Sequence, residues 1–181
     1  DKINPICIHP MFGPGIKTVK NQNIISVPIK DAKKELTVAK ELFEGANFVT
    51  IDAIEHDKKI AIILGLTHLM NLVFANIISK DEKSLLTEKM SGTTFRVQKV
   101  LAESIMTETP ELIETIIANP EIRRVAEELW KDVGRLLTSV QESKTEEVIE
   151  YIKDCQERLS KHSDLDNSYK KLTKMAKIIE K

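Results

Sequence analysis

The long apolar run from Ile60 to Ile78, IAIILGLTHLMNLVFANII, restricts the possible folds more than any other part of this sequence. A segment of this length that is apolar nearly all round is either a membrane-spanning helix or a helix at the centre of a helical domain or dimer. The run contains Thr67, His68 and Asn71, and the sequence has no second apolar run of this kind. Because ionisable groups are rare in single membrane spans, we favour a buried helix of a soluble domain.

The composition agrees with a soluble globular protein. Of 181 residues, 41% are hydrophobic and 30% charged, and the formal net charge of -1 does not indicate binding to nucleic acid or anionic membranes. The two cysteines, Cys7 and Cys155, have neither metal-ligand nor CxxC spacing, and the N-terminus lacks the pattern of a signal peptide. We therefore expect reduced thiols in a cytoplasmic protein, with a disulfide as the alternative, and no metal site.

The first fifty residues differ from the rest because they alternate short β-branched runs with turn residues. We predict strands at Pro5–His9, Asn23–Ile29 and Asn47–Ile51, and a helix at Asp31–Glu44 that ends at Gly45. Three strands and one helix are too few to bury both faces of such a sheet. Residues 1–51 are therefore predicted to be an incomplete α/β domain.

From Asp52 onward the periodicity predicts only helices, so residues 52–181 form an all-helical domain and the protein is mainly α. Pro110 and Pro120 suit the first turns of helices that Thr109 and Asn119 cap, and either Ser143 or Thr145 caps a later helix. The predicted helices are Ala53–Ser79, Lys83–Lys89, Thr94–Glu108, Pro110–Ala118, Pro120–Gln141, Lys144–Ser160 and Leu165–Glu180.

The turn sequence CIHPMFGPG, residues 7–15, contains the first candidate for chemistry, His9. Pro10 favours extended backbone at His9, and Gly13 and Gly15 allow a tight return with close approach of a ligand. A neutral imidazole at a strand end can accept a proton from a substrate hydroxyl. The alternative is a loop histidine without a function.

Two further histidines lie at or within the long predicted helix. His56 and Asp57 stand near its start, where the carboxylate can simply favour the helix dipole or, with His56, support a nearby cleft. His68 shares one helix face with Asn71, beside Thr67. Such a polar cluster on an apolar helix indicates a pocket wall, although a lone helical histidine is more often a satisfied core residue.

Arg96 follows a break at Ser91–Gly92 that separates two predicted helices. Its guanidinium can bind a carboxylate with two parallel hydrogen bonds, or form an ordinary surface salt bridge. The fourth histidine, His162, lies in a polar helix end and is predicted to be solvated. The sequence contains neither a GxGxxG nor a P-loop motif.

Taken in order, three segments of the sequence resemble the prephenate dehydrogenase family. They are HPMFGP, AIEHDKKIAIILGLTHL and SGTTFRVQKVLAESIMTETPELIETIIANPE. The resemblance implies a helical dimerisation and substrate domain of the 6-phosphogluconate-dehydrogenase C-terminal type, preceded by a short remnant of a Rossmann domain. It further implies an entwined homodimer with the long apolar helix at its centre.

The same resemblance implies an activity and assigns roles to residues. These enzymes oxidise and decarboxylate prephenate to 4-hydroxyphenylpyruvate with NAD or NADP, in tyrosine biosynthesis. His9 matches the catalytic histidine that accepts a hydrogen bond from the ring hydroxyl, and Arg96 matches the arginine that binds the substrate carboxylate. His68 matches a histidine lining the pocket for substrate and for tyrosine as an inhibitor, and His56 matches the histidine at the helix start. Cofactor-binding residues are not assigned.

The sequence also departs from the family pattern. Asn71 stands where many members have a second histidine, and no Gly-rich cofactor fingerprint precedes HPMFGP, so we expect a fragment that is inactive alone. Arogenate is an alternative substrate because it shares the ring hydroxyl and ring carboxylate. The alternative of another class is a non-catalytic helical protein whose apolar helix drives dimerisation.

Overall fold

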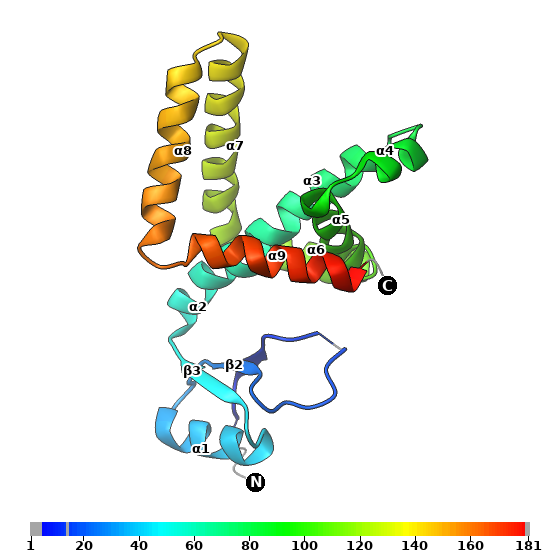
Figure 1. Cartoon of the computed structure of the whole chain (residues 1–181). Coiled ribbons are helices and arrows are strands. Elements are labelled where there is room, and N and C mark those ends of the chain that lie inside the picture. The colour runs from blue at the N-terminus through cyan, green and yellow to red at the C-terminus, as the bar shows by residue number, and fades with distance from the viewer. Residues whose placement is uncertain (1–4, 14, 180–181) are drawn as a thin grey trace. The chain divides into compact units, whose positions relative to one another are not determined.

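The computed structural model describes residues 5–13 and 15–179 (Figure 1). Pro14 of the HPMFGP motif and Glu180 of the last predicted helix lie outside the described residues. The chain forms two compact units, Asp1–Ile60 and Ala61–Lys181. The protein is mainly helical, as predicted, and the described residues after Thr50 form no strand. The domain boundary after residue 51 stays a prediction.

The first unit contains a three-stranded sheet in the order β1-β2-β3. The central strand β2 pairs antiparallel with β1 and parallel with β3, and its residues Ile24 and Ile25 are buried. Helix α1 connects the two parallel strands, and helix α2 follows β3. The bounds are Ile8–Pro10 for β1, Asn23–Ser26 for β2, Ala32–Leu42 for α1, Asn47–Thr50 for β3 and Ala53–Ile60 for α2.

The start of α1 is held by two carboxylates. Asp31 is its N-cap and accepts a backbone N–H three residues later. Glu35 reaches back and accepts the N–H groups of Ile29, Lys30 and Asp31 at 2.7–2.9 Å. These three backbone hydrogen bonds hold the pKa of Glu35 below its ordinary value. After the helix, Gly45 has φ +81°, which favours glycine there and explains why the helix ends before it.

The second unit contains only helices in its described residues. Thr109 and Asn119 cap α6 and α7 through their side chains, as predicted. The predicted cap of α8 was wrong, because Lys144 occupies the N-cap and Ser143 adopts φ 55° in the preceding turn. The helices are η1 (Ala61–Leu66), α3 (Thr67–Ile78), α4 (Ser84–Met90), α5 (Thr93–Ile105), α6 (Pro110–Ile117), α7 (Pro120–Gln141), α8 (Thr145–Ser160) and α9 (Leu165–Ile179).

Packing in the second unit centres on η1 and α3. Helix α7 packs on η1 and pairs with α8 as a hairpin, while α3 packs on α5, which also carries α9 (Figure 1). Ala61, Ile122 and Val125 form a buried hydrophobic cluster between η1 and α7. Gly65 lies directly under Ile122, so that a Cβ atom at Gly65 would stand 2.4 Å from Ile122 Cδ1. The residues of η1 form a wide π-helical turn, whereas the sequence predicted a regular helix.

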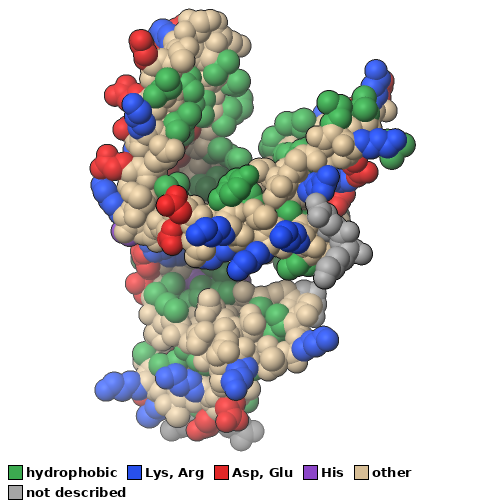
Figure 2. Space-filling model, in the orientation of Figure 1, with side chains coloured by type: hydrophobic (Ala, Val, Ile, Leu, Met, Phe, Trp, Pro, Cys, Tyr) green, Lys and Arg blue, Asp and Glu red, His purple; other side chains and the backbone are tan. Residues whose placement is uncertain are grey.

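The long helix from Ala53 to Ile78 is apolar and long enough to cross a membrane. We predicted a buried helix, yet only 28% of its most apolar window is buried within this chain. Ile62, Met70 and Val73 on this helix are about half exposed. Hydrophobic side chains also gather along the hairpin of α7 and α8 (Figure 2), where Trp130 is 79% exposed. The single chain therefore leaves large apolar surfaces uncovered.

Candidate active site

The sheet of the first unit brings His9 to the edge where its parallel strands end. In β1, His9 pairs with Ile25 of β2, one position from the last pair of the two strands. Strand β3 ends at Thr50, and α2 begins at Ala53 after a short connection. Asp52 caps this helix through the N–H of Glu55 at 2.9 Å. The sequence placed His9 at the end of a strand, whereas in the structure it is the middle residue of β1, which continues to Pro10.

His9, His56 and Asp57 form a continuous line of hydrogen bonds, which we call the histidine chain. His9 Nδ1 lies 3.0 Å from His56 Nε2, and His56 Nδ1 lies 2.9 Å from Asp57 Oδ1. The two imidazole rings are 5.2 Å apart between centroids and inclined by 51°. The side chain of His56 is 18% exposed and that of Asp57 is 54% exposed. The histidine chain therefore leads from the partly buried ring of His9 towards solvent.

The geometry of the histidine chain restricts where its protons can lie. A carboxylate only accepts hydrogen bonds, so His56 Nδ1 is the donor to Asp57. In a neutral His56 ring, Nε2 is then the acceptor and His9 Nδ1 must donate to it. Burial lowers the pKa of His9 below its ordinary value, and the electrostatic effect of His56 lowers it further, so both disfavour a charged His9 ring. The remaining lone pair of His9 is therefore on Nε2, where a hydroxyl can donate to it.

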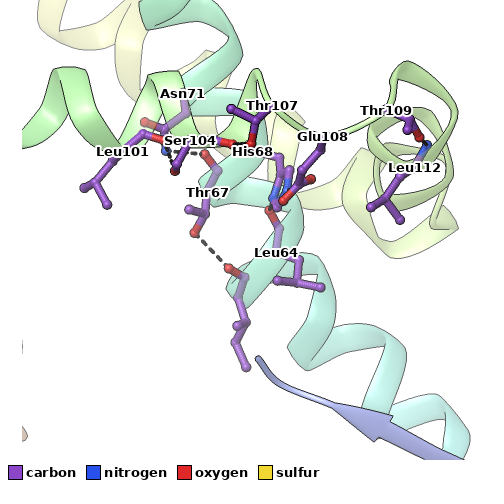
Figure 3. A network of polar contacts seen from close by, with 11 residues as sticks. Leu64, Thr67, His68, Asn71, Leu101, Ser104, Thr107, Glu108, Thr109 and Leu112 are labelled. Atoms are coloured by element: carbon purple, nitrogen blue, oxygen red, sulfur yellow. Dashed lines mark hydrogen bonds and ion pairs between the residues drawn. The ribbon is translucent and has the colours of Figure 1, made fainter. Parts of the chain in front are cut away.

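In the second unit, His68 has partners at both ring nitrogens (Figure 3). Nδ1 donates to the carbonyl oxygen of Leu64 at 2.8 Å, and Nε2 lies 3.3 Å from Glu108 Oε2. His68 is 6% exposed, and the Glu108 side chain is 35% exposed. Because both nitrogens face oxygen atoms, the pair with Glu108 requires a proton either on Nε2 or on the carboxyl group. Both ring nitrogens of the buried His68 are therefore hydrogen-bonded within the chain. This is the alternative that the sequence left open, a core histidine with all its hydrogen bonds made.

Asn71 continues the polar face of α3 with partners of its own. Its amide nitrogen donates to the carbonyl of Thr67 at 2.8 Å, and its oxygen accepts from Gln98 Nε2 of α5 at 2.7 Å. Asn71 is 5% exposed, whereas Thr67 is exposed and donates to the carbonyl of Ile63. The predicted polar face therefore exists, and in this chain it joins α3 to α5.

Arg96 lies in the first turns of α5, after the predicted helix break at Ser91–Gly92. Its Nε donates to Ser91 Oγ at 3.1 Å, which orients the guanidinium group. Around it is a hollow of about 400 Å³ whose lining includes Phe95, Val100 and Ile179. Lys99 also lines this hollow, together with the carboxylates of Glu88 and Glu103 with which it pairs. Arg96 adds a guanidinium there that can bind a small carboxylate ligand.

The structure therefore joins some predicted residues and leaves others apart. His9 and His56 are in contact, although the sequence separates them by 47 residues. His68 and Arg96 belong to the second unit and have different partners there. Sequence reasoning missed Glu108 and Gln98, because nothing in their local patterns links them to residues of α3.

The described residues do not fit the pyrophosphate of a nicotinamide cofactor. A dinucleotide fold presents free backbone N–H groups at the start of the helix after a strand, next to a Gly-rich turn. In this chain, the turn before α1 contains no glycine, and the Glu35 carboxylate already binds the N–H groups of Ile29, Lys30 and Asp31. We therefore assign no cofactor contact to these residues and derive no step through a cofactor.

Comparison with known proteins gives one family match. The model of the family described as prephenate dehydrogenase, dimerization domain, matches residues 52–154. No curated protein sequence matches this chain.

Two solved structures share the fold. The crystal structure of Synechocystis arogenate dehydrogenase has 14% identity and a TM-score of 0.65, over 87% of this chain and 61% of that one. Prephenate dehydrogenase from A. aeolicus, in complex with hydroxyphenyl propionate and NAD+, has 18% identity and a TM-score of 0.65, over 87% of this chain and 59% of that one. This chain thus spans about three fifths of the length of either protein.

Proposed function

Because this chain belongs to the prephenate dehydrogenase family, we propose that it is the part of such an enzyme that holds His9, Arg96 and the dimer contacts. The proposed reaction is the oxidative decarboxylation of prephenate to 4-hydroxyphenylpyruvate with NAD or NADP, in tyrosine biosynthesis in the cytoplasm. A bound NAD+ in the A. aeolicus relative supports a nicotinamide cofactor. The observation that carries the proposal is the hydrogen bond between His9 Nδ1 and His56 Nε2 at 3.0 Å, which leaves Nε2 of His9 for a substrate hydroxyl.

The proposed role of His9 follows from the chemistry of the substrate. Oxidation at the carbon that bears the ring hydroxyl becomes easier as the hydroxyl proton is withdrawn, and Nε2 of a neutral imidazole is a suitable acceptor. Loss of the ring carboxylate as carbon dioxide then gives an aromatic product, which makes the reaction effectively irreversible. We assign Arg96 to the substrate carboxylate, since Ser91 orients its guanidinium beside a partly apolar hollow.

His56 and His68 take different roles in this proposal. His56 acts through His9, whose Nδ1 it contacts. Both ring nitrogens of His68 bind atoms of this chain, so we propose that His68 shapes the pocket for substrate or for tyrosine through its pairing with Glu108. Arogenate remains the alternative substrate, because His9 and Arg96 recognise only groups that both compounds share.

The test is reduction of NAD or NADP by the full-length protein that contains this chain, with prephenate and arogenate offered separately. We expect turnover with one of them, and we expect His9→Asn to lower kcat/KM by about 100- to 10,000-fold while the circular dichroism spectrum is unchanged. The matched control is His162→Asn, a change at an exposed histidine in the turn between α8 and α9. The 181-residue chain alone should be inactive. Full activity of His9→Asn would exclude His9 as the acceptor of the hydroxyl proton. Absence of turnover by the wild type with either substrate would favour the non-catalytic dimerisation protein.

We also propose that a second copy of this chain covers the exposed apolar surfaces. The matched family model describes a dimerisation domain, and the long helix exposes Ile62, Met70 and Val73. Val73→Glu should weaken the dimer, because it places a charge on a surface that has to be desolvated. Light scattering after size exclusion measures this change, and Val38→Glu on the exposed side of α1 is the matched control. An unchanged dimer mass with Val73→Glu would exclude this surface.

A further inference from the structure

The histidine chain connects the base of the proposed reaction to solvent in three steps. We propose that His9 takes the proton of the substrate hydroxyl at Nε2 and passes its own Nδ1 proton to His56, and that Asp57 stabilises the resulting imidazolium. This inference rests on the proposed function, in which His9 accepts the hydroxyl proton. It assigns His56 and Asp57 as residues that act through His9 and do not touch the substrate.

Two protonation states of the histidine chain satisfy every hydrogen bond between its members. In the first, His56 Nδ1–H donates to Asp57 and His9 Nδ1–H donates to His56 Nε2, so His9 Nε2 is an acceptor. In the second, one more proton is present, and His56 is an imidazolium that donates from both nitrogens. His9 then accepts at Nδ1 and carries its proton on Nε2. The two states keep the same heavy-atom positions and differ only in where protons lie.

The proton transfer converts the first state into the second without leaving a charge on His9. The hydroxyl O–H bond breaks as a proton bonds to His9 Nε2, and the His9 Nδ1–H bond breaks as that proton bonds to His56 Nε2. One proton leaves the substrate, one positive charge appears on His56, and no electrons leave the two rings. The positive charge therefore ends one ring away from the substrate.

The residues around the two rings explain why the positive charge of the second state lies on His56 and not on His9. His9 is half-buried, and its lowered pKa means that its ring resists a positive charge. His56 lies 2.9 Å from the Asp57 carboxylate, which attracts an imidazolium, and Asp57 is exposed enough to pass a proton to water. Of the other charged side chains of α2, Glu55 and Lys59 pair with each other at 3.3 Å, and Lys58 is exposed.

Conservative variants separate proton transfer from simple orientation. Glutamine in His56→Gln places an amide near the position of Nε2, where its oxygen can accept the His9 Nδ1–H but cannot become charged. In the full-length protein, we expect His56→Gln to leave KM within about 3-fold and to lower kcat by about 10- to 100-fold. Asp57→Asn keeps an acceptor but removes the charge, so the acid limb of the kcat/KM profile should move to lower pH. His162→Gln serves as the control.

A direct readout comes from the ring nitrogens themselves. With 15N-labelled histidine in the same protein, and assignment by His9→Asn and His56→Gln, we expect both rings to carry their proton on Nδ1 at high pH. As the pH falls, the first added proton should appear on His56, and His9 should switch to the Nε2–H form. An added proton that appears first on His9, or unchanged kcat in His56→Gln, would overturn the relay. Absence of turnover by the wild type with either substrate would instead overturn the proposed function.

Discussion

Gly65 offers the sharpest test of how the second unit is packed. A Cβ atom at this position would lie 2.4 Å from Ile122 Cδ1, 2.5 Å from Cγ1 and 3.6 Å from Cβ. Ile122 is 3% exposed and packs among Ala61 and Val125, so its side chain cannot turn into solvent. Gly65→Ala therefore forces a shift between η1 and α7, the two elements that this contact joins.

The expected change in the free energy of unfolding combines two opposing effects. Replacing glycine by alanine inside a helix is favourable by up to about 1 kcal/mol, and overpacking a core costs about 1–3 kcal/mol. The matched control is Gly134→Ala in α7, where nothing lies within 4 Å of the added Cβ. We expect Gly134→Ala to stabilise the protein slightly and Gly65→Ala to be about 1–3 kcal/mol less stable than that control.

Urea unfolding followed by far-UV circular dichroism measures both variants, at one protein concentration because an oligomer's stability depends on it. Ile122→Ala removes the two atoms nearest to the added Cβ, and the remaining distance of 3.6 Å is an ordinary contact. The double variant Gly65→Ala, Ile122→Ala should therefore be less destabilised than the sum of the single changes, by about 1 kcal/mol or more. Additive effects, or a Gly65→Ala variant as stable as Gly134→Ala, would refute the packing of α7 on Gly65.

Two further changes test individual hydrogen bonds. The backbone bonds of Glu35 lower its pKa, so their stabilisation is present above the ordinary glutamate pKa and is lost as the pH falls through the lower folded value. Urea midpoints of wild type and Glu35→Gln should hence differ at neutral pH and converge in acid, and a constant difference would contradict this. Asn71→Leu removes buried Asn71, the acceptor of the half-buried Gln98, and should cost about 1–3 kcal/mol by the same assay, with partial recovery in Asn71→Leu, Gln98→Leu. A single variant as stable as wild type would show that this bond contributes nothing.

The elements with strong local signals were predicted well from the sequence. Helix α7 has the predicted bounds Pro120–Gln141, because Asn119 caps it and proline suits its first turn. The strands β1 to β3 lie within a few residues of their predicted positions, because short β-branched runs between turn residues mark them in the sequence. The cap of α8 was not predicted correctly, since the backbone of Ser143 turns left-handed and removes its hydroxyl from the cap position.

Features that depend on distant residues could not be predicted in this way. The contact of His9 with His56 joins β1 to the helix that follows β3, although β2 lies between these two strands in the sheet. The π-helical turn of η1 occurs where Ile122 of a later helix packs on Gly65. Neither the sheet order nor that packing follows from local periodicity. The resemblance to a family could therefore name His9 and His56, but only the structure shows that they are in contact.

The polar residues of the long helix deserve a different interpretation from the one the sequence suggested. His68 and Asn71 were the reason to disfavour a membrane span, yet both are buried and bonded within the chain, while the apolar residues Ile62, Met70 and Val73 of that helix are exposed. A bilayer could therefore cover this helix, but it could not cover α7, where Trp130 is exposed between the charged residues of an amphipathic helix. A protein surface with both apolar and polar groups can cover α3 and α7 alike. A second copy of the chain offers such a surface, because each copy brings its own exposed α3 and α7 to the contact.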